Sequence, residues 1–385
     1  MSDIYSNSYL TIAASKARSA TETLFVPGQI EQGQTHWFRS SDNQMYAIHT
    51  REPEPHLYDF GGYAWQTETQ AYRRTHRKTP LPLLRRAWAF QERYLSPRVV
   101  HFGPAELLWE CAEDKCCECS NAKYPEDRKR LHVSGNTKPT YMYTSAQIWM
   151  DLIEQYTEKE LTYPSDIFPG IQGVAKAMDR AGNYHAGIWD DDDVLQQLVW
   201  RAAKPGRPEK WRAPSWSWAS VRGPVRYLLR SSHMGWKPKQ MASLVSISTS
   251  PVGLDPLGEV RSGRLQLKGP CVDMQLDHRG LSREFPHKQV WTWPRQGVPS
   301  WHTRWSPDYD LSPFYGRTVK MMDIIHWPND HVDDRRFLEN RCYLVFICVN
   351  EVEEIYERIG HFEPHGEHII GPLSGLGEET VLTIV

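Results

Sequence analysis

Four charged residues in and around one short segment have the chemistry of an acid–base or ion-binding site. The segment is RAWAFQERYLSPRVVHFGPAELLWEC, residues 86–111, and the four residues are Arg86, Glu92, Arg93 and Glu110. Arg86 and Arg93 are seven residues apart, which places them near one face of a helix, whereas Glu92 falls off that line. Buried Arg–Glu pairs can stabilise a fold as readily as they can act in catalysis, so a structural role and an acid–base role both stay open.

Four cysteines crowd between Cys111 and Cys119 and raise the question of a zinc site. Zinc sites need two separated ligand pairs, or cysteines combined with histidines at a defined spacing. No second pair follows here, and His132 lies thirteen residues beyond Cys119. We therefore expect no metal and interpret these residues as free thiols. A Cys–His nucleophile pair stays open, because nothing in the sequence selects one cysteine over another.

Two charged runs have simpler interpretations than ligand binding. The aspartates at 190–193 precede an apolar helical pattern, where carboxylates cap and stabilise a helix N-terminus. We prefer the capping interpretation to a divalent-cation site, because the ligands of such an ion must converge on one point. The basic residues between positions 73 and 86 resemble a solvated face, since the formal net charge of the chain is only -2. We expect no nucleic-acid partner.

The composition narrows the class of protein further. The 385 residues contain no G-x-S-x-G elbow, no phosphate-binding G-x-x-x-x-G-K-[ST] loop and no H-E-x-x-H motif. The sequence also contains no export signal and no run of eighteen apolar residues. We expect a cytoplasmic protein with reduced thiols that does not associate with membranes.

Short elements must position these residues. The patterns predict a strand at residues 9–14, short strands near 45–49 within an irregular stretch, a helix at 83–94, and strands at 98–102 and 106–111. Residues 116–141 read as a surface loop. Helices are expected at 145–161, after the Ser165-Asp166 cap, and after Asp193. The alternation in residues 215–221 predicts a strand with Trp216 and Trp218 on one face, followed by strands at 241–248, 264–268, 272–275, 342–349 and 380–385.

Five motifs in order resemble the fungal heterokaryon incompatibility (HET) domain proteins. They are IYSNSYLTIAAS (4–15), the segment 86–111, LTYPSDIFPGIQGVAKAM (161–178), GIWDDDDVLQQLVWRA (187–202) and RAPSWSWASVRGPV (212–225). The resemblance implies a partial, TIR-like α/β domain at 1–225, with a helical segment at about 145–202, and a β-rich variable region at 226–385. The whole chain would then be of mixed α+β class. The resemblance also implies structural roles for six residues of these motifs: Trp88, Gln91, Trp109, Cys111, Trp216 and Trp218.

The resemblance implies a role in nonself recognition between fungal strains and in the cell death that follows fusion of incompatible hyphae. HET domains begin upstream with segments similar to Y-x-A-L-S-Y-x-W-G and W-I-D-x-x-C-I-N-Q, which this sequence does not contain. We therefore expect a chain that acts mainly through assembly with itself or with a protein partner. The alternative is an NAD-cleaving or repurposed enzyme with a pocket in the Trp-rich C-terminal region. NAD is implied by the family resemblance alone, and no other cofactor is expected.

Overall fold

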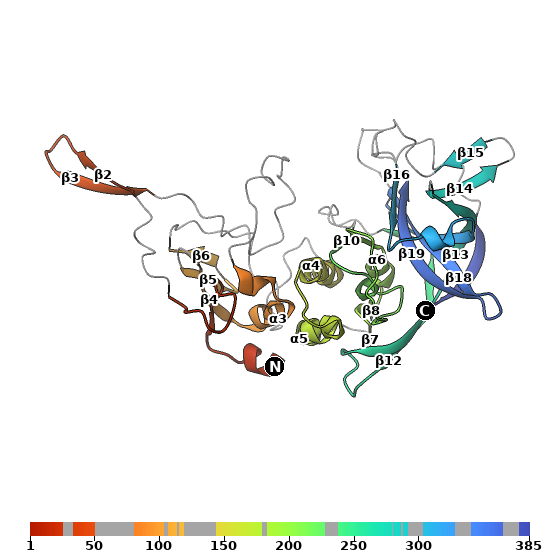
Figure 1. The fold of residues 1–385 in the computed structure, drawn as a ribbon, viewed down its shortest axis with the longest axis horizontal. Coiled ribbons are helices and arrows are strands. Elements are labelled where there is room, and N and C mark those ends of the chain that lie inside the picture. Colours follow the sequence, from red (N-terminus) through yellow and green to blue (C-terminus); the bar gives the residue numbers. More distant parts are fainter. Residues whose placement is uncertain are drawn as a thin grey trace. The chain divides into compact units, whose positions relative to one another are not determined.

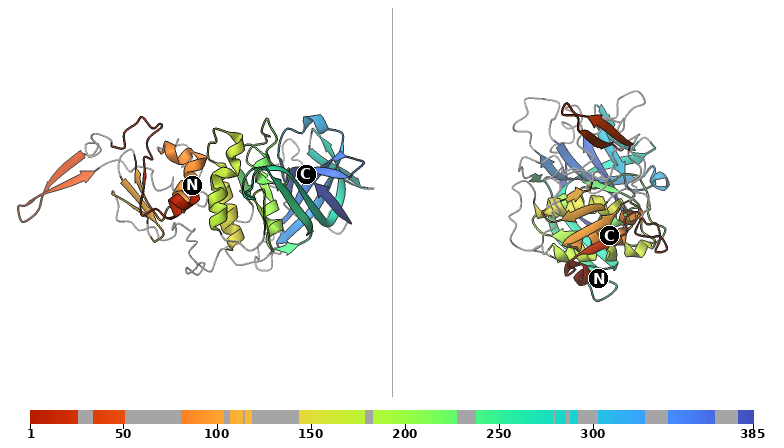
Figure 2. Two further views of the ribbon diagram at one scale, coloured as in Figure 1. Left: turned by 90° about the horizontal axis from the view of Figure 1, so that it is seen from below. Right: turned by 90° about the vertical axis from the view of Figure 1, so that its left-hand side faces the viewer.

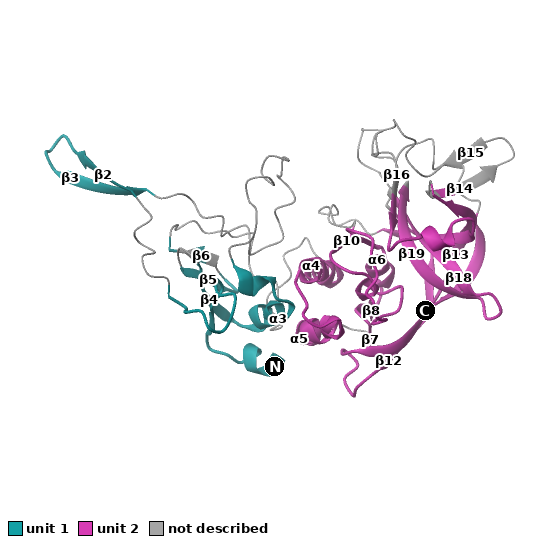
Figure 3. Cartoon of the chain, in the orientation of Figure 1, with its two compact units in different colours: residues 1–135 teal, residues 136–385 magenta. Residues whose placement is uncertain are grey.

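The computed structural model describes most of the chain, and two compact units can be distinguished in it. The described residues are 1–25, 34–50, 81–103, 107–113, 115–118, 144–178, 183–227, 238–278, 280–285, 288–291, 303–327, 340–364 and 377–385. Unit 1 comprises Met1–Gly135 and unit 2 comprises Asn136–Val385 (Figure 3). The predicted boundary between residues 225 and 226 therefore falls inside unit 2.

Unit 1 is built on a four-stranded sheet with the order β1-β4-β5-β6. Its elements in chain order are α1 (Ser2–Ser6), β1 (Thr11–Ala13), β2 (Gln34–Arg39), β3 (Met45–Thr50), the 3-10 turn η2 (Pro82–Arg85), α3 (Ala87–Leu95), β4 (Arg98–Phe102), β5 (Leu107–Cys111) and β6 (Lys115–Cys117). Strands β1 and β4 are parallel, whereas β4, β5 and β6 are antiparallel. The strands predicted at 9–14, 98–102 and 106–111 are confirmed.

Three predictions in unit 1 agree with the structure only in part. The helix predicted at 83–94 is interrupted at Arg86, whose extended backbone (φ -78°, ψ 133°) separates η2 from α3. The strand near 45–49 is confirmed as β3, and β2, within a stretch predicted to be irregular, pairs with it (Figure 1). Of the loop predicted at 116–141, residues 119–141 lie outside the described part, and Cys116 lies in β6.

The first part of unit 2 is mainly helical. Its elements are α4 (Ser145–Thr157), η4 (Pro164–Ile167), α5 (Pro169–Ala177), β7 (Asn183–His185), β8 (Ile188–Asp190), α6 (Val194–Leu198), β9 (Trp200–Ala202), η5 (Trp218–Ser220) and β10 (Val225–Tyr227). Helix α4 begins with a capping box, because Thr144 Oγ1 accepts from the Gln147 amide at 3.2 Å and Gln147 Oε1 accepts from the Thr144 amide at 2.8 Å. The helix predicted at 145–161 is thus confirmed, although it ends at Thr157.

The rest of unit 2 is a large, mostly antiparallel sheet. Its elements are β11 (Lys239–Gln240), β12 (Ser243–Pro251), β13 (Val260–Asp277), β14 (Gly280–Phe285), β15 (Lys288–Trp291), β16 (Thr303–Pro307), η7 (Ser312–Phe314), β17 (Thr318–Trp327), β18 (Asn340–Asn350), β19 (Ile355–Pro364) and β20 (Glu378–Ile384). The strong curvature of this sheet is visible in Figure 2. The predicted β-rich C-terminal region and the mixed α+β class are therefore confirmed.

Five strands of this sheet close into a barrel. The pairs β17–β18, β18–β19, β19–β20, β20–β13 and β13–β17 complete a ring, and β13 is long enough to pair with β20 through Leu265–Cys271 and with β17 through Cys271–Gln275. Closure removes the exposed edges that an open sheet would present. Buried side chains of β13, β17, β18 and β19, including Met274, Met321, Val345 and Phe362, form one apolar core.

Three predictions for unit 2 are wrong in detail. Residues 215–221 form a turn and the short η5 rather than a strand. Helix α5 begins at Pro169 with no side-chain cap, so the predicted Ser165-Asp166 cap lies in η4 instead. The helix predicted after Asp193 is confirmed as α6, but the helical segment expected to reach about residue 202 ends at Leu198, because the chain continues as β9, which pairs with β10. None of the helices in the described residues is long and apolar enough to span a membrane.

Candidate functional site

The strongest polar cluster among the residues predicted for a site is a buried ion pair in unit 1. Arg93 on α3 donates from Nε to Glu110 Oε2 at 2.7 Å and from Nη2 to Oε1 at 2.9 Å. Both side chains are buried, since Arg93 is 8% and Glu110 1% exposed. The two-point geometry matches the fork of the guanidinium to the carboxylate. The pair fastens α3 to the sheet through β5.

A histidine and a serine extend this ion pair into a chain of polar contacts. His101 on β4 places Nε2 3.3 Å from Glu110 Oε2 and Nδ1 2.8 Å from Ser15 Oγ. Ser15 follows β1, and its carbonyl accepts from the Leu83 amide at the start of η2. A proton on His101 Nε2 leaves Nδ1 as the acceptor for the Ser15 hydroxyl. Sequence reasoning missed both residues, although Ser15 ends the motif at 4–15 and His101 lies in the segment 86–111, because their contact joins residues 86 positions apart.

The order hydroxyl, imidazole, carboxylate is that of a serine hydrolase triad, but the surroundings differ from those of an active site. Ser15 and His101 are 0% exposed, so a substrate would have to open the sheet to reach the hydroxyl. The Arg93 guanidinium also neutralises the carboxylate. This cluster, Ser15–His101–Glu110–Arg93, is therefore arranged to join β1, β4, β5 and α3, and we refer to it as the unit 1 polar network.

The other two predicted charged residues lie apart from the unit 1 polar network. Arg86 is exposed at the extended joint between η2 and α3. Glu92 is half-buried beside Tyr5 of α1; burial and then the charge of Glu92 raise the pKa of Tyr5. The structure thus brings Arg93 and Glu110 together and places Arg86 and Glu92 elsewhere on α3 and its N-terminus. Residues 73–80 of the basic run lie outside the described residues.

The six family-motif residues occupy different environments. Gln91 is buried at 3% exposure, whereas Trp88 and Trp109 are only half-buried, so the apolar core of unit 1 depends on other residues, such as Phe90 and Leu108. Cys111 has a free thiol at the end of β5. Across the part of the chain that the structure describes, no group of His, Cys, Asp and Glu could hold a metal ion. Cys119 lies outside that part.

The two tryptophans of the last motif are core residues of unit 2. Trp216 and Trp218 are 0% and 1% exposed. The indole Nε1 of Trp218 donates to the Gly187 carbonyl at 3.1 Å, and Trp149 Nε1 donates to the same oxygen at 3.0 Å. Trp200 Nε1 donates to the Trp216 carbonyl at 3.1 Å. The indoles of Trp149, Trp200 and Trp218 thus pack the helical part of unit 2 with their N–H groups satisfied, whereas Trp216 Nε1 has no hydrogen-bond partner within the described residues.

The aspartates that precede α6 make turn contacts rather than a helix cap. Asp193 occupies the N-cap position, but its side chain makes no capping hydrogen bond. Its Oδ1 instead accepts from Gln196 Nε2 at 2.7 Å. Asp191 Oδ1 accepts from the Asp193 amide at 3.1 Å and from Gln197 Nε2 at 3.2 Å. The predicted capping is therefore wrong in its contacts, because local hydrogen bonds of these short side chains compete with the cap.

Unit 2 contains a second buried network, centred on Arg358 of β19. Its Nε lies 3.0 Å from Asp308 Oδ2, its Nη1 donates to the Leu198 carbonyl at 2.7 Å and its Nη2 donates to the Trp200 carbonyl. The guanidinium carbon also lies 3.4 Å from the centre of the Trp200 ring. Burial raises the pKa of Asp308 to about 6 despite the opposing charge of Arg358.

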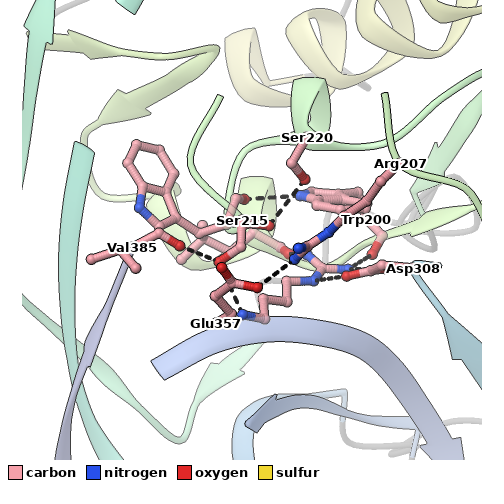
Figure 4. A network of polar contacts seen from close by, with 10 residues as sticks. Trp200, Arg207, Ser215, Ser220, Asp308, Glu357 and Val385 are labelled. Carbon is pink, nitrogen blue, oxygen red and sulfur yellow. Dashed lines mark hydrogen bonds and ion pairs between the residues drawn. The ribbon is translucent and has the colours of Figure 1, made fainter. Parts of the chain in front are cut away.

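Ser215 and Arg207 connect this network to its neighbours (Figure 4). Ser215 Oγ accepts from the Arg358 amide at 2.9 Å and donates to the Val385 carbonyl. Arg207 lies 2.7 Å from Glu357 through Nη2 and Oε2 and stacks 3.7 Å from the centre of the Tyr309 ring. Since Arg358 and Asp308 are 1% exposed each, the network ties the helical part of unit 2 to its barrel. The Arg358 network therefore stabilises the fold of unit 2 and does not form a ligand-binding surface.

Comparison with known proteins adds one match. Residues 1–92 match the family model described as Heterokaryon incompatibility protein (HET). No curated protein and no solved structure matches the chain. The matched range contains the motif at 4–15 and the first residues of the motif at 86–111, whereas the motifs after residue 160 lie outside it. The resemblance to heterokaryon incompatibility (HET) proteins that the sequence predicted is therefore confirmed for residues 1–92.

Proposed function

We propose that this protein acts in fungal nonself recognition and in the cell death that follows fusion of incompatible hyphae, and that it acts through protein assembly in the cytoplasm. The HET match of residues 1–92 supports this role. The observation that carries the assembly mechanism is the burial of the unit 1 polar network: Ser15, His101 and Glu110 are at most 1% exposed. Groups so placed stabilise a fold and do not meet a substrate.

The resemblance to TIR-like domains extends this proposal to the fold of unit 1. The parallel pairing of β1 with β4, with α3 directly before β4, is compatible with an α/β sheet of that class. The sheet then serves as a platform on which a partner assembles. The HET-like part would continue to residue 225, beyond the matched range.

The alternative is cleavage of NAD, and one observation favours it. Glu110 lies beside His101, and such a pair could become an acid–base pair if the sheet opened. In the Trp-rich C-terminal region itself, Trp305 is buried in the apolar core of the barrel, and Trp293 and Trp301 lie outside the described residues.

Two measurements on the full chain separate these functions. Under the assembly proposal, expression alone is tolerated by a hypha, death follows fusion with a strain that supplies an incompatible partner, and the purified chain releases no nicotinamide from NAD. Release of nicotinamide that Glu110→Gln abolishes, with the far-UV circular dichroism unchanged, would establish the enzyme instead. Survival of every fused hypha would overturn the role in incompatibility.

A further inference from the structure

The β2–β3 hairpin of unit 1 presents apolar side chains to solvent on both of its faces. All twelve residues of Gln34–Arg39 and Met45–Thr50 are exposed. Large apolar residues among them are Trp37 (64% exposed), Phe38 (52%), Met45 (52%), Tyr46 (51%) and Ile48 (50%). Among the described residues no third strand pairs with this hairpin, and an isolated two-stranded hairpin is only marginally stable in water. This hairpin therefore has the composition of a strand pair that is completed by another element.

The turn of the hairpin determines which backbone groups are unpaired. The Ser40 amide donates to the Gln44 carbonyl at 2.9 Å, the Asn43 amide donates to the Ser40 carbonyl at 3.0 Å, and Asn43 has a left-handed φ of 70°. This is a type I turn followed by a bulge. Ser40 and Gln44 form a hydrogen-bonded pair, and such pairs alternate along antiparallel strands. The N–H and C=O groups of Met45, Ala47 and His49 therefore point away from β2.

We propose that β3 pairs with β3 of a second copy of this chain, antiparallel and about a two-fold axis at Ala47. The resulting sheet has the order β2-β3-β3-β2. In this register the outward-pointing groups of Ala47 bond to Ala47 of the second copy, and those of Met45 bond to His49. The inference rests on the proposed function in one respect, since it names the partner through which assembly would begin.

The side chains of β3 are complementary to themselves in this register. Paired residues lie on the same face of a sheet, so Tyr46 of each copy lies opposite Ile48 of the other, an aromatic and β-branched pair that stabilises antiparallel strands. Phe38 lies opposite Tyr46 within each hairpin. One face of the four-stranded sheet thus carries six large apolar side chains, three from each copy. The two-fold axis creates a continuous apolar face from two separate ones.

The charge pattern favours a second copy as the occupant. Met45–Thr50 contains no Asp, Glu, Lys or Arg, so the edge lacks the charged residues that normally prevent strand pairing. The two-fold axis also brings no like charges together, because His49 lies opposite Met45. The three large apolar side chains of β3, Met45, Tyr46 and Ile48, are each about half exposed and offer roughly 100 Å² apiece. Two copies would then bury about 600 Å² of these side chains at most, less than a standard specific interface. We therefore expect a weak, concentration-dependent dimer.

Sedimentation velocity of the full chain across the micromolar range tests this dimer. Ala47→Pro removes the amide at the two-fold axis and leaves the bonds to β2 in place, because that amide points away from β2. Thr35→Pro is the matched control, since Thr35 occupies the equivalent outward position on β2, opposite His49. We expect a wild-type dimer, at least a tenfold weaker dimer for Ala47→Pro, and wild-type behaviour for Thr35→Pro. Equal effects of the two substitutions, or a wild-type monomer throughout, would overturn the proposal.

Cross-linking provides a second measurement that does not depend on proline. Ala47→Cys places two thiols across the axis, and a short bismaleimide should join them into a covalent dimer. Thr35→Cys, together with the wild-type chain and its native thiols, gives the background. A dimer yield equal to that background would contradict the register. If the dimer forms and fused hyphae nevertheless survive, the proposed function fails and the dimer stands; if death occurs with a monomeric chain, only the dimer fails.

Discussion

Arg358 connects distant parts of unit 2 through one buried guanidinium group. We expect Arg358→Met to lower the free energy of unfolding by about 3–5 kcal/mol, because the substitution leaves Asp308 buried without its charge partner. Chemical denaturation followed by tryptophan fluorescence measures the loss, since Trp200 lies against the guanidinium. The double variant Arg358→Met, Asp308→Leu should recover part of that loss.

Arg207→Met is the control for Arg358→Met. The Arg207–Glu357 pair lies nearer the surface, with 37% and 28% of the two side chains exposed, and ion pairs in such positions contribute about 1 kcal/mol or less. Losses of similar size for Arg207→Met and Arg358→Met would show that burial does not determine the contribution of these arginines.

His361 is expected to make the folded state sensitive to acid. Its ring is fully buried, neither nitrogen has a hydrogen bond within the described residues, and Nδ1 lies 3.4 Å from Glu363 Oε1. Burial, and then the positive charges of Arg358 and Arg201, hold the pKa of His361 well below 6.5. The unfolded chain therefore binds a proton that the folded chain excludes, and stability is lost as the pH falls below about 6.5.

Thermal unfolding of the wild type and of His361→Gln at several pH values measures this effect. We expect the wild type to lose up to about 1.4 kcal/mol per pH unit below the unfolded pKa relative to the variant. Asp308 and Asp323, whose pKa values burial raises to about 6, act in the opposite direction, because stability from their protonated forms is lost as the pH rises toward 6. The comparison of the two proteins cancels that contribution, and parallel curves would contradict the role of His361.

The turn between β7 and β8 requires glycine for two reasons. Gly187 has a left-handed φ of +93°, and a Cβ there would lie 2.2 Å from Trp218 Nε1. We expect Gly187→Ala to destabilise unit 2 by about 2–5 kcal/mol, the sum of backbone strain and displacement of the indole. Gly223→Ala is the matched control, because Gly223 has a similar φ of +78° but, among the described residues, no atom lies within 4 Å of its added Cβ.

For Gly223→Ala we expect only the backbone cost, about 1–2 kcal/mol. Denaturant titration of both variants measures the difference. A loss for Gly187→Ala no larger than that for Gly223→Ala would mean that the tryptophan contacts adapt without cost.

Elements were predictable where a local pattern was sufficient. Strands β4 and β5 follow from apolar alternation on both sides of a Gly-Pro dipeptide, and α4 follows from its apolar face. Residues 215–221 alternate in the same way, yet they form a turn, because Trp218 directs its indole to the carbonyl of Gly187, thirty-one residues earlier. A local pattern cannot reveal such a partner.

The contacts of the candidate site were likewise not predictable from local sequence patterns. Arg93 and Glu110 were predictable as charged residues of one helix and one strand, but Ser15 and His101 join them only through the sheet. Arg358 meets Leu198 and Trp200 across about 160 positions of sequence. Contacts at such separations depend on the whole fold, and no motif in a single sequence encodes them.

At the scale of the molecule, the compact units indicate where the chain can be divided. We expect a fragment of residues 136–385 to unfold cooperatively, because it retains Leu198, Trp200 and Ser215, the partners of Arg358. A fragment of residues 226–385 loses all three and should be much less stable. Circular dichroism and thermal unfolding of both fragments test this expectation. Equal stability would instead support the boundary predicted between residues 225 and 226.

The barrel of unit 2 also has a consequence for the order of events during synthesis. Strand β13 begins at Val260, and its partner β20 ends at Ile384, so the ring cannot close until β20 has left the ribosome. A topology with pairings this distant folds slowly, on the millisecond to second scale. During that interval β13 and β19 lack the strand that joins them, and nascent chains with such open edges depend on chaperones to avoid aggregation.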